Sequence, residues 1–445
     1  MTLNDLRVRI ENKQALLAVI GLGYVGLPVA CEFAKVGYDV LGVEQNPERV
    51  TAINSGDPPF VGDEPGLSEL LSQVLSSGKF RAISNYELLS ERDIVLICVE
   101  TPIDGDNIPH YHALRSSLSG LGRVLKPESL VIVESTVSPG TMSGLALPLL
   151  EQSSGLKSNQ GFFLGICPER VMPGKLLSNL RNVNRVVGGM TPETADTMKT
   201  LYRQITTADL DTTDCITAEL VKTVENAYRD VQIAFVNEVA LICDAVGGNV
   251  WQVRELVNKS PGRQMLQPGV GVGGHCIPKD PWLLAHSVID EDVPVRLIPA
   301  ARQVNDSMPA HAADLVQNSL QRKGMDIAAA RILILGYAYL EESDDPRNSP
   351  SQALFQNLVM KGASVVIHDP YVPGYQGSLE EMVSGCDALV IAVKHRSYQR
   401  INLREIYSKM RTPILVDGRG FIDAEQAVQA GFLYMGLGQG FQEQS

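Results

Sequence analysis

The sequence contains no Cys-x-x-Cys pair and no apolar run of about 18 residues, the length that a membrane-spanning helix needs. We therefore expect no membrane span. The N-terminal stretch also lacks an uninterrupted apolar segment followed by small residues, so we expect no signal peptide and a cytoplasmic protein. The seven cysteines are odd in number and widely spaced, which argues against a disulfide scaffold and a structural zinc site. We expect no bound metal. The cysteines lie at positions 31, 98, 167, 215, 243, 276 and 386.

Positive charge is scarce relative to negative charge. Lysine and arginine number 38 against 51 aspartates and glutamates, which gives a net charge of −13. Because nucleic acid phosphates and anionic lipid surfaces repel an acidic chain, we expect neither nucleic acid nor a membrane as a partner. The apolar fraction of 44% and the charged fraction of 20% are typical of a globular protein, and 445 residues suggest about three domains.

Short apolar strands alternate with helical patterns at both ends of the chain. Such alternation predicts parallel sheets covered on both faces. Between them, residues 218–243 carry apolar side chains at helical spacing and predict one long helix, which would join domains or lie in a subunit interface. We therefore predict an α/β protein with two Rossmann-like doubly wound domains joined by a central helical region, with boundaries near 210 and 320. The predicted strands are 15–20, 39–43, 93–99, 130–134, 332–335, 364–367, 388–393 and 413–416, and a further helix is 349–361.

A glycine-rich turn follows the first predicted strand. It reads GLGYVG at 21–26 and opens a predicted helix, which is the context of a dinucleotide-binding turn. Gly21 permits the turn, Gly23 admits the pyrophosphate and Gly26 lets helix and strand pack. Glu44 ends the next strand, where a carboxylate would bond the ribose 2′-hydroxyl and repel a 2′-phosphate. The pattern predicts NAD rather than NADP, with Arg49 on the adenosine side. The alternative is the same turn in a ligand-free doubly wound domain.

Four glycines precede a cysteine in the segment GVGVGGHCIPKDP at 269–281. A glycine-rich backbone can approach a ligand closely and expose the Cys276 thiol. The Lys279 ammonium would favour the thiolate, which is the nucleophile, and the Asp280 carboxylate could orient water or accept a proton. The alternative is a buried, inert cysteine in a glycine-rich turn.

A cysteine nucleophile combined with NAD suggests two oxidations at one site. Hydride transfer would turn an alcohol into an aldehyde, and the thiolate would attack the aldehyde before it leaves. A second hydride transfer would give a thioester, which water would hydrolyse to an acid.

These motifs, with others, resemble the UDP-glucose/GDP-mannose dehydrogenase family over nearly the whole chain. The resemblance implies an NAD-binding Rossmann domain at 1–210, a central helical dimerisation region at 211–320 and a UDP-sugar-binding domain at 321–445. It also implies a homodimer. Within the family, three segments are most similar to the UDP-N-acetyl-D-mannosamine dehydrogenases, which serve surface polysaccharide synthesis. They are CPERVMPG at 167–174, NAYRDVQIAFVNE at 226–238 and QPGVGVGGHCIPKDPW at 267–282. The motifs are GLGYVG at 21–26, ETP at 100–102, ESTVSPG at 134–140, CPERVMPG at 167–174, ELVKTVENAYRDVQIAFVNE at 219–238, GVGGHCIPKD at 271–280 and SDDPRNSP at 343–350.

The resemblance implies catalytic roles for several residues. Cys276 would form the thiohemiacetal and the thioester at C6 of a UDP-N-acetylhexosamine. Lys222 and Asn226 match helix residues that hold the reacting oxygen, and their spacing of four places them on one helix face. Asp280 matches a carboxylate that transfers protons with Lys222 and a water. Without the motif, Lys222 would be expected to be a solvated helix lysine.

The resemblance implies further residues that act on the water or bind the ligands. Glu169 and Thr136 match catalytic positions beside the hydrolytic water. The cofactor-binding positions are Gly21, Gly23, Tyr24, Val25, Gly26, Glu44, Arg49, Thr101, Pro102, Thr136 and Arg347. The substrate-binding positions are Arg170, Val171, Lys222, Asn226, Arg229, Arg263, Gly273, Tyr339 and Arg419.

Two segments depart from the family pattern. Leu340 follows Tyr339 where the family often has a lysine that meets the sugar nucleotide, so one cation is lost. The segment KSPGR at 259–263 lacks a histidine, and Arg263, which matches an arginine that crosses to the neighbouring subunit's site, is shifted by one. UDP-glucose, UDP-N-acetylglucosamine and UDP-N-acetylgalactosamine stay open as substrates. A weakly catalytic nucleotide-sugar-binding protein also stays open, as does a two-electron 3-hydroxyacid dehydrogenase, which would not need Cys276.

Overall fold

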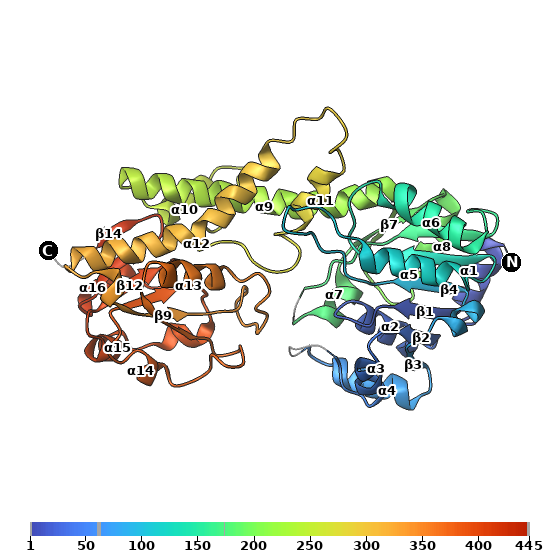
Figure 1. Ribbon diagram of the computed structural model, residues 1–445, viewed down its shortest axis with the longest axis horizontal. Helices are drawn as coiled ribbons and strands as arrows, with labels where there is room; N and C mark the ends of the chain where they lie inside the picture. Colours follow the sequence, from blue (N-terminus) through green and yellow to red (C-terminus); the bar gives the residue numbers. More distant parts are fainter. Residues whose placement is uncertain (1, 60–63, 173, 443–445) are drawn as a thin grey trace. The chain divides into compact units, whose positions relative to one another are not determined.

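The computed structural model describes residues 2–59, 64–172 and 174–442. Contacts within the chain divide it into two compact units. Unit 1 comprises Met1–Glu225 and Trp282–Val293, and unit 2 comprises Asn226–Pro281 and Pro294–Ser445. In Figure 1, unit 1 is drawn mainly in blue to green and unit 2 mainly in yellow to red. The chain passes between the units three times.

Unit 1 contains an eight-stranded sheet with the order β3-β2-β1-β4-β5-β6-β7-β8. Neighbouring strands run parallel except β6 and β7, which run antiparallel. The order reverses between β1 and β4, which is where doubly wound sheets bind ligands. The strands are β1 (Leu16–Ile20), β2 (Asp39–Val43), β3 (Phe80–Ile83), β4 (Ile94–Ile97), β5 (Ser129–Val133), β6 (Phe162–Ile166), β7 (Arg185–Gly189) and β8 (Leu210–Asp214).

Helices cover both faces of this sheet, as the alternating side chains of β1 show. Leu17 and Val19 pack into a core with α1, α2, α3, α4, α7 and α8, whereas Ala18 and Ile20 pack into a second core with α5 and α6. Both faces of β1 are therefore buried, as expected for a parallel sheet. The helices are α1 (Leu3–Glu11), α2 (Gly26–Lys35), α3 (Pro47–Asn54), α4 (Leu67–Ser76), α5 (His112–Gly122), α6 (Leu147–Ser154), α7 (Leu176–Asn182) and α8 (Pro192–Tyr202).

Unit 2 contains a six-stranded sheet with the order β10-β9-β11-β12-β13-β14, in which only β13 and β14 pair antiparallel. One face packs against α12 and α13, and the other packs against α14, α15 and α16. The strands are β9 (Arg331–Leu335), β10 (Ser364–His368), β11 (Ala388–Ile391), β12 (Ile414–Asp417), β13 (Leu433–Gly436) and β14 (Gly440–Gln442). The helices are α12 (Leu297–Arg322), α13 (Pro350–Met360), α14 (Leu379–Met382), α15 (Leu403–Lys409) and α16 (Ala424–Gln429).

The central helices are α9 (Cys215–Val246), α10 (Val250–Asn258) and α11 (Asp280–His286). Helix α9 is continuous over 32 residues and crosses from unit 1 to unit 2 between Glu225 and Asn226 (Figure 1). It contains the predicted helix 218–243 and extends it at both ends.

The predicted fold class is confirmed, with two Rossmann-like sheets and a helical region that contains a long helix. Each sheet also contains one antiparallel pair, which the expectation of purely parallel sheets did not include. The predicted strand 93–99 is shorter in the structure, where β4 begins at Ile94 and ends at Ile97. The boundaries near 210 and 320 stay predictions. Among the residues that the structure describes, no helix combines the length and the apolar character that a bilayer crossing requires.

Candidate active site

The glycine turn after β1 has the geometry that a dinucleotide requires. Gly21 has φ +89°, and a Cβ added there would lie 2.6 Å from the carbonyl oxygen of Cys98. A Cβ added to Gly26 would lie 1.9 Å from the carbonyl oxygen of Gly21. By contrast, a Cβ at Gly23 would meet no atom within 4 Å, so space remains beside this glycine. The turn, the close helix packing and the open second glycine all fit NAD.

The acidic residue at the end of β2 is buried beside a cation. The Glu44 carboxylate accepts a hydrogen bond from the Asn46 N–H at 3.1 Å, and its Oε2 lies 3.7 Å from Nη1 of Arg49. Arg49 also donates to the carbonyl oxygen of Pro59 at 3.1 Å. Both sequence-predicted residues therefore lie together at the end of β2, where an adenosine ribose would bind.

Two further contacts connect the loops around the glycine turn. Thr101 Oγ1 donates to the carbonyl oxygen of Thr136 at 2.6 Å, which connects the loops after β4 and β5. Val25, within the glycine turn, and Pro102, which follows Thr101, are both partly buried. The Tyr24 hydroxyl donates to Glu64, whose carboxylate also accepts from the Gly174 N–H at 2.6 Å and the Leu176 N–H at 3.2 Å. Sequence reasoning did not identify Glu64, because nothing in its local pattern distinguishes it from a surface acid.

A buried charge cluster lies at the carboxyl ends of β5 and β6. Oε2 of Glu169 lies 2.9 Å from Nη2 of Arg185, and Oε1 accepts from the Arg170 N–H at 2.7 Å. Glu134 accepts a hydrogen bond of 2.5 Å from the Tyr202 hydroxyl. Burial, reinforced by the Glu169 charge, raises the pKa of Glu134 above its usual range. Arg185 therefore holds Glu169 from inside the protein, a role that the sequence did not reveal.

The two predicted substrate positions after Glu169 differ in their surroundings. The Arg170 guanidinium donates to the carbonyl oxygen of Asn184 at 2.8 Å and lies 3.1 Å from Oε2 of Glu225. It is therefore engaged by the chain itself. Val171 is partly buried and packs against the core of unit 1.

The cysteine loop lies in unit 2 and exposes its thiol. Of the seven cysteines, all of which the structure describes, Cys276 alone is exposed. The N–H groups of Lys279 and Asp280 donate to the Cys276 carbonyl oxygen at 3.1 and 2.8 Å, and the turn leads into α11. Nζ of Lys279 lies 3.4 Å from Oδ1 of Asp280. The alternative that Cys276 is buried is therefore wrong, whereas the reactivity of its thiol stays a prediction.

A buried carboxylate connects this turn to α9. Asn226 Nδ2 donates to Oδ2 of Asp280 at 2.5 Å, and Asp280 is 0% exposed. Lys222, one turn earlier on α9, is only 8% exposed, so it is not a solvated helix lysine. Within the described residues its ammonium has no ion pair or hydrogen bond, which leaves it available to a ligand. Arg229 is exposed on the same helix.

The packing and the backbone conformation of the cysteine loop require glycine at positions 271, 273 and 274. A Cβ at Gly273 would lie 2.6 Å from Cβ of Tyr339, and one at Gly274 would lie 2.7 Å from the ring of Tyr339. The Gly274 N–H donates to the carbonyl oxygen of Arg347 at 3.0 Å. Gly271 and Gly274 have φ of +133° and +89°. The Arg347 guanidinium lies 2.6 Å from Oδ2 of Asp345.

A polar network that the sequence did not reveal fixes the start of this loop. Asn237 on α9 accepts from the Gly269 N–H at 3.0 Å and donates to Oδ1 of Asn305 on α12 at 2.9 Å. Asp230 accepts from Nδ2 of Asn305 at 2.8 Å and from Nη1 of Arg302 at 2.6 Å. Four polar or charged side chains inside the unit, together with the Gly269 N–H, form this network. It therefore orients the loop relative to α9 and α12.

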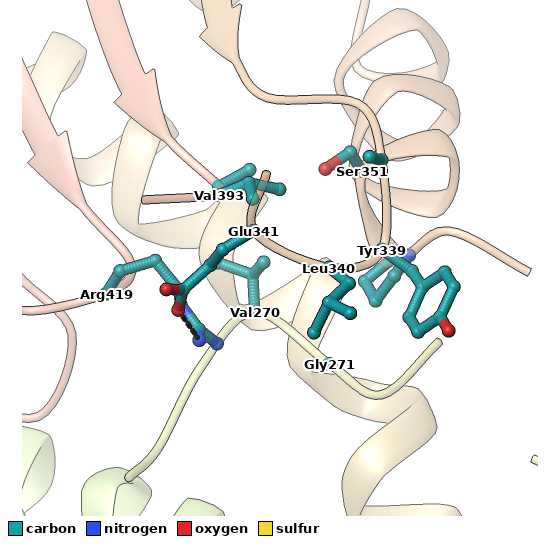
Figure 2. Close-up of a pocket in the computed structure, with 11 residues that line it drawn as sticks. Val270, Gly271, Tyr339, Leu340, Glu341, Ser351, Val393 and Arg419 are labelled. Carbon is teal, nitrogen blue, oxygen red and sulfur yellow. Dashed lines mark ion pairs between the residues drawn. The ribbon is translucent and has the colours of Figure 1, made fainter. Parts of the chain in front are cut away.

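A pocket of unit 2 opens at the carboxyl ends of β9, β11 and β12. Figure 2 shows Arg419 and Glu341 side by side in its lining, joined by an ion pair, with Leu340 beside Tyr339. Nη2 of Arg419 lies 3.6 Å from Oε1 of Glu341. Burial raises the pKa of Tyr339 to about 12, so its hydroxyl stays neutral. Arg263 is exposed and does not line this pocket. The lining residues are Val270, Gly271, Ala338, Tyr339, Leu340, Glu341, Pro350, Ser351, Ala392, Val393 and Arg419.

The candidate residues thus form two sets. Unit 1 holds the glycine turn, Glu44, Thr101, Thr136 and Glu169, whereas unit 2 holds the cysteine loop, Asn226, Asp280 and Arg419. Lys222 lies in unit 1 on the helix that continues into unit 2. In the part of the chain that the structure describes, no three His, Cys, Asp or Glu side chains are grouped to hold a metal ion.

Three family models match the chain. They are the NAD binding domain of the UDP-glucose/GDP-mannose dehydrogenase family over residues 15–206, its central domain over 216–307 and its UDP binding domain over 333–424. The chain belongs to the UDP-glucose/GDP-mannose dehydrogenase family. It is an NAD-dependent nucleotide-sugar dehydrogenase, and its cofactor is NAD.

Individual members of the family match over almost their full length. The UDP-N-acetyl-D-mannosamine dehydrogenase of Pyrococcus horikoshii is 39% identical over 424 residues, which are 95% of this chain and 99% of the relative. The structure of UDP-D-ManNAc dehydrogenase from that organism superposes with a TM-score of 0.90 and covers 95% of this chain and 99% of its own. An NDP-N-acetyl-D-galactosaminuronic acid dehydrogenase structure from Methanosarcina mazei Go1 superposes with a TM-score of 0.86 at 36% identity, and covers 99% of this chain and 98% of its own.

Proposed function

We propose that the protein oxidises the C6 hydroxyl of UDP-N-acetyl-D-mannosamine to the carboxylate, for surface polysaccharide synthesis. The observation that carries the proposal is the arrangement in unit 2, where an exposed Cys276 thiol and a buried Asp280 carboxylate share one turn. Asn226 donates to that carboxylate from α9. The names of the relatives support the mannosamine substrate.

The proposed reaction removes four electrons at one carbon. Bound NAD supplies the hydride acceptor for each oxidation. Loss of a hydride and a proton from the C6 alcohol leaves an aldehyde, and the Cys276 sulfur adds to its carbon to form a thiohemiacetal. Loss of a second hydride leaves a thioester. Water then breaks the carbon–sulfur bond, so that one alcohol, one water and two NAD give one carboxylate, two NADH and three protons.

Side chains of the chain assist each step of this route. The Lys222 ammonium and the Asn226 amide donate hydrogen bonds to the negative charge that develops on the C6 oxygen. Asp280 accepts a proton during the oxidation together with Lys222 and a water. The Lys279 ammonium at 3.4 Å and the hydrogen bond from Asn226 hold its carboxylate in place. Glu169 and Thr136 orient the hydrolytic water. Arg185 fixes the Glu169 carboxylate at 2.9 Å and acts as its positioning residue.

Product stoichiometry tests the substrate and the four-electron reaction together. We expect incubation with NAD and UDP-N-acetyl-D-mannosamine to give two NADH per uronate, measured by absorbance at the NADH band and by mass spectrometry of the sugar nucleotide. The same assay with UDP-glucose, UDP-N-acetylglucosamine and UDP-N-acetylgalactosamine should give slower turnover. Faster turnover of one of these would replace the mannosamine substrate. Binding of UDP-sugars without any NADH would support a weakly catalytic binding protein instead.

Selective alkylation tests the covalent step. Because Cys276 is the one exposed cysteine of the seven, limiting iodoacetamide should label it first. We expect NADH production to fall in proportion to the labelled fraction of Cys276, read by peptide mass spectrometry. The Cys276→Ala variant should lose uronate formation by at least about a thousandfold. Cys243→Ala, at a buried cysteine of α9, is the matched control and should stay active. Normal uronate formation by Cys276→Ala would refute the covalent route.

We also propose that the protein forms a homodimer through α9. Large apolar side chains are exposed along one stripe of this helix, at intervals of four or seven residues. A contiguous exposed apolar stripe marks an interaction surface, and its length suits a second copy of the same helix. Val253, Leu256 and Val257 extend the apolar surface onto α10. The stripe residues are Ile216, Leu220, Val224, Tyr228, Phe235, Ile242 and Val246.

A further inference from the structure

The pocket of unit 2 lacks the cation that the family pattern places at position 340. Leu340 lines the pocket there, between Tyr339 and Glu341 (Figure 2). Arg419 is the cation among the lining residues, and Glu341 lies 3.6 Å from it. A pocket with one arginine and one glutamate is electrically balanced, whereas additional positive charge would strengthen the binding of a nucleoside diphosphate.

A second cation, Lys394 in the loop after β11, also lies near Glu341. Lys394 follows Val393, which lines the pocket, and its Nζ lies 3.7 Å from Oε1 of Glu341. The Lys394 ammonium also donates to Oε1 of Gln267 at 2.9 Å, which fixes its position. Lys394 and Arg419 therefore flank one carboxylate oxygen, and the side chains of both remain 24% exposed.

We propose that Lys394 supplies the cation that position 340 lacks, and that it binds the diphosphate of the sugar nucleotide together with Arg419. The inference rests on the proposed function, because it concerns the substrate of that reaction. In the absence of substrate, Glu341 occupies the place of the diphosphate between the two cations. Substrate binding displaces this carboxylate.

The sheet register places both cations at the edge where ligands bind. Parallel pairing aligns Leu335 of β9 with Ile391 of β11, and Ile391 with Asp417 of β12. The loops that leave these strands carry Glu341, Lys394 and Arg419, in that order. The strand order reverses between β9 and β11, and the crevice at the carboxyl ends of such strands is the ligand site of doubly wound sheets.

The long distances in the two ion pairs of Glu341 indicate that Lys394 and Arg419 bind a ligand, and that their main role is not to stabilise the fold. Both nitrogen–oxygen distances exceed the roughly 2.7–2.9 Å of a charge-assisted hydrogen bond, so neither cation is saturated by Glu341. Burial lowers the pKa of Arg419, which means that its cationic form would gain from a nearby anion. A diphosphate carries more negative charge than one carboxylate and can pair with both cations at once.

Titration calorimetry of the full-length protein with UDP and with uridine tests the assignment. Lys394→Met should weaken UDP binding by about tenfold and leave uridine binding unchanged, since only UDP carries the phosphates. Adding Leu340→Lys to Lys394→Met should restore most of the lost UDP affinity. Lys409→Met removes a partly exposed lysine of α15 that pairs with Glu405, and this control should bind UDP as the wild type does.

A further variant, at Glu341, tests whether this carboxylate and the diphosphate compete for the same two cations. If Glu341 competes with the diphosphate, Glu341→Gln should raise UDP affinity severalfold. Equal UDP affinity of Lys394→Met and the wild type would overturn the inference, and so would an equal loss of UDP and uridine binding or a double variant as weak as Lys394→Met. If the wild type itself does not bind UDP, the proposed function fails as well. That result is therefore distinguishable from failure of the Lys394 assignment alone.

Discussion

Buried carboxyl groups beside the candidate site are the most informative single residues. Glu169 pairs with the buried Arg185, whose charge also acts on the neighbouring Glu134, and Glu219 on α9 accepts hydrogen bonds from N–H groups of the loop after β5. Gly140 and Met142 donate to it at 2.9 and 2.7 Å. Burial nevertheless raises the pKa of Glu219 to about 7, because desolvation outweighs these hydrogen bonds. The loop that carries Thr136 is thus held by a group that titrates near neutrality.

Replacing Glu219 with glutamine should remove a pH dependence of stability. A raised folded-state pKa means that the folded protein keeps its proton between about 4.5 and about 7, whereas the unfolded chain releases it. The protonated Glu219 therefore contributes its full share of the free energy of unfolding below pH 4.5. This contribution is lost as the pH rises to about 7, and the loss is about 3 kcal/mol at most. Glu219→Gln mimics the protonated group. We therefore expect the thermal unfolding midpoint of the variant, relative to that of the wild type, to be higher at pH 8 than at pH 5.

The comparison between variant and wild type cancels the other titrating groups. Glu193→Gln, at an exposed position on α8, is the control and should follow the wild-type profile. A constant difference between Glu219→Gln and the wild type from pH 5 to pH 8 would contradict a raised pKa.

Residue patterns predicted only the contacts that are local along the chain. Cys276 and Asp280 are four residues apart in one motif, so the sequence placed them together, and Lys222 and Asn226 share a helix face for the same reason. The contact from Asn237 to Gly269 joins residues far apart in the sequence. Such contacts depend on how α9 packs in unit 2, which no local pattern encodes.

At the scale of elements, the long helix was the clearest sequence feature and has an unpartnered apolar stripe. If α9 forms the dimer interface, a charge in the stripe should separate the subunits, because burying an unpaired carboxylate is costly. Phe235 is 63% exposed near the middle of the helix. We expect the wild type to be a dimer by light scattering with size-exclusion chromatography, and Phe235→Glu to be a monomer.

The control for this prediction introduces the same change elsewhere. Met360 is 77% exposed at the end of α13, outside the stripe, so Met360→Glu should remain dimeric. A monomeric wild type, or a dimeric Phe235→Glu protein with unchanged affinity, would place the stripe outside the subunit interface.

The elements that the sequence did not predict have weak patterns. The strand β8 reads LDTTD and is mostly exposed at the sheet edge, so it lacks the apolar run of the central strands. Helix α12 contains Pro309, which normally argues against a helix interior. The antiparallel pairing of β6 with β7 depends on the path of the chain between them, not on the residues within either strand.

At the scale of the whole molecule, the chain crosses between its units close to the predicted catalytic residues. Lys222 and Asn226 flank the crossing at Glu225, and Cys276 and Asp280 precede the crossing at Pro281. After that crossing, the Leu283 carbonyl accepts from the Ser138 hydroxyl at 2.7 Å, so the segment from Trp282 belongs to unit 1. The catalytic candidates are thus covalently connected to both ligand-binding units.

Each ligand should therefore protect its own unit first. Hydrogen–deuterium exchange of the intact protein should slow most at 20–27 when NAD is added, because backbone N–H groups of the glycine turn bind the pyrophosphate. UDP alone should instead slow exchange most at 336–341 and 417–421, the loops that surround Arg419. UMP, with one phosphate fewer, should give the same pattern with weaker protection. If UDP protected the glycine turn more than the Arg419 loops, unit 2 would not be the nucleotide-sugar site, and the assignment of the two ligands to the two sheets would be wrong.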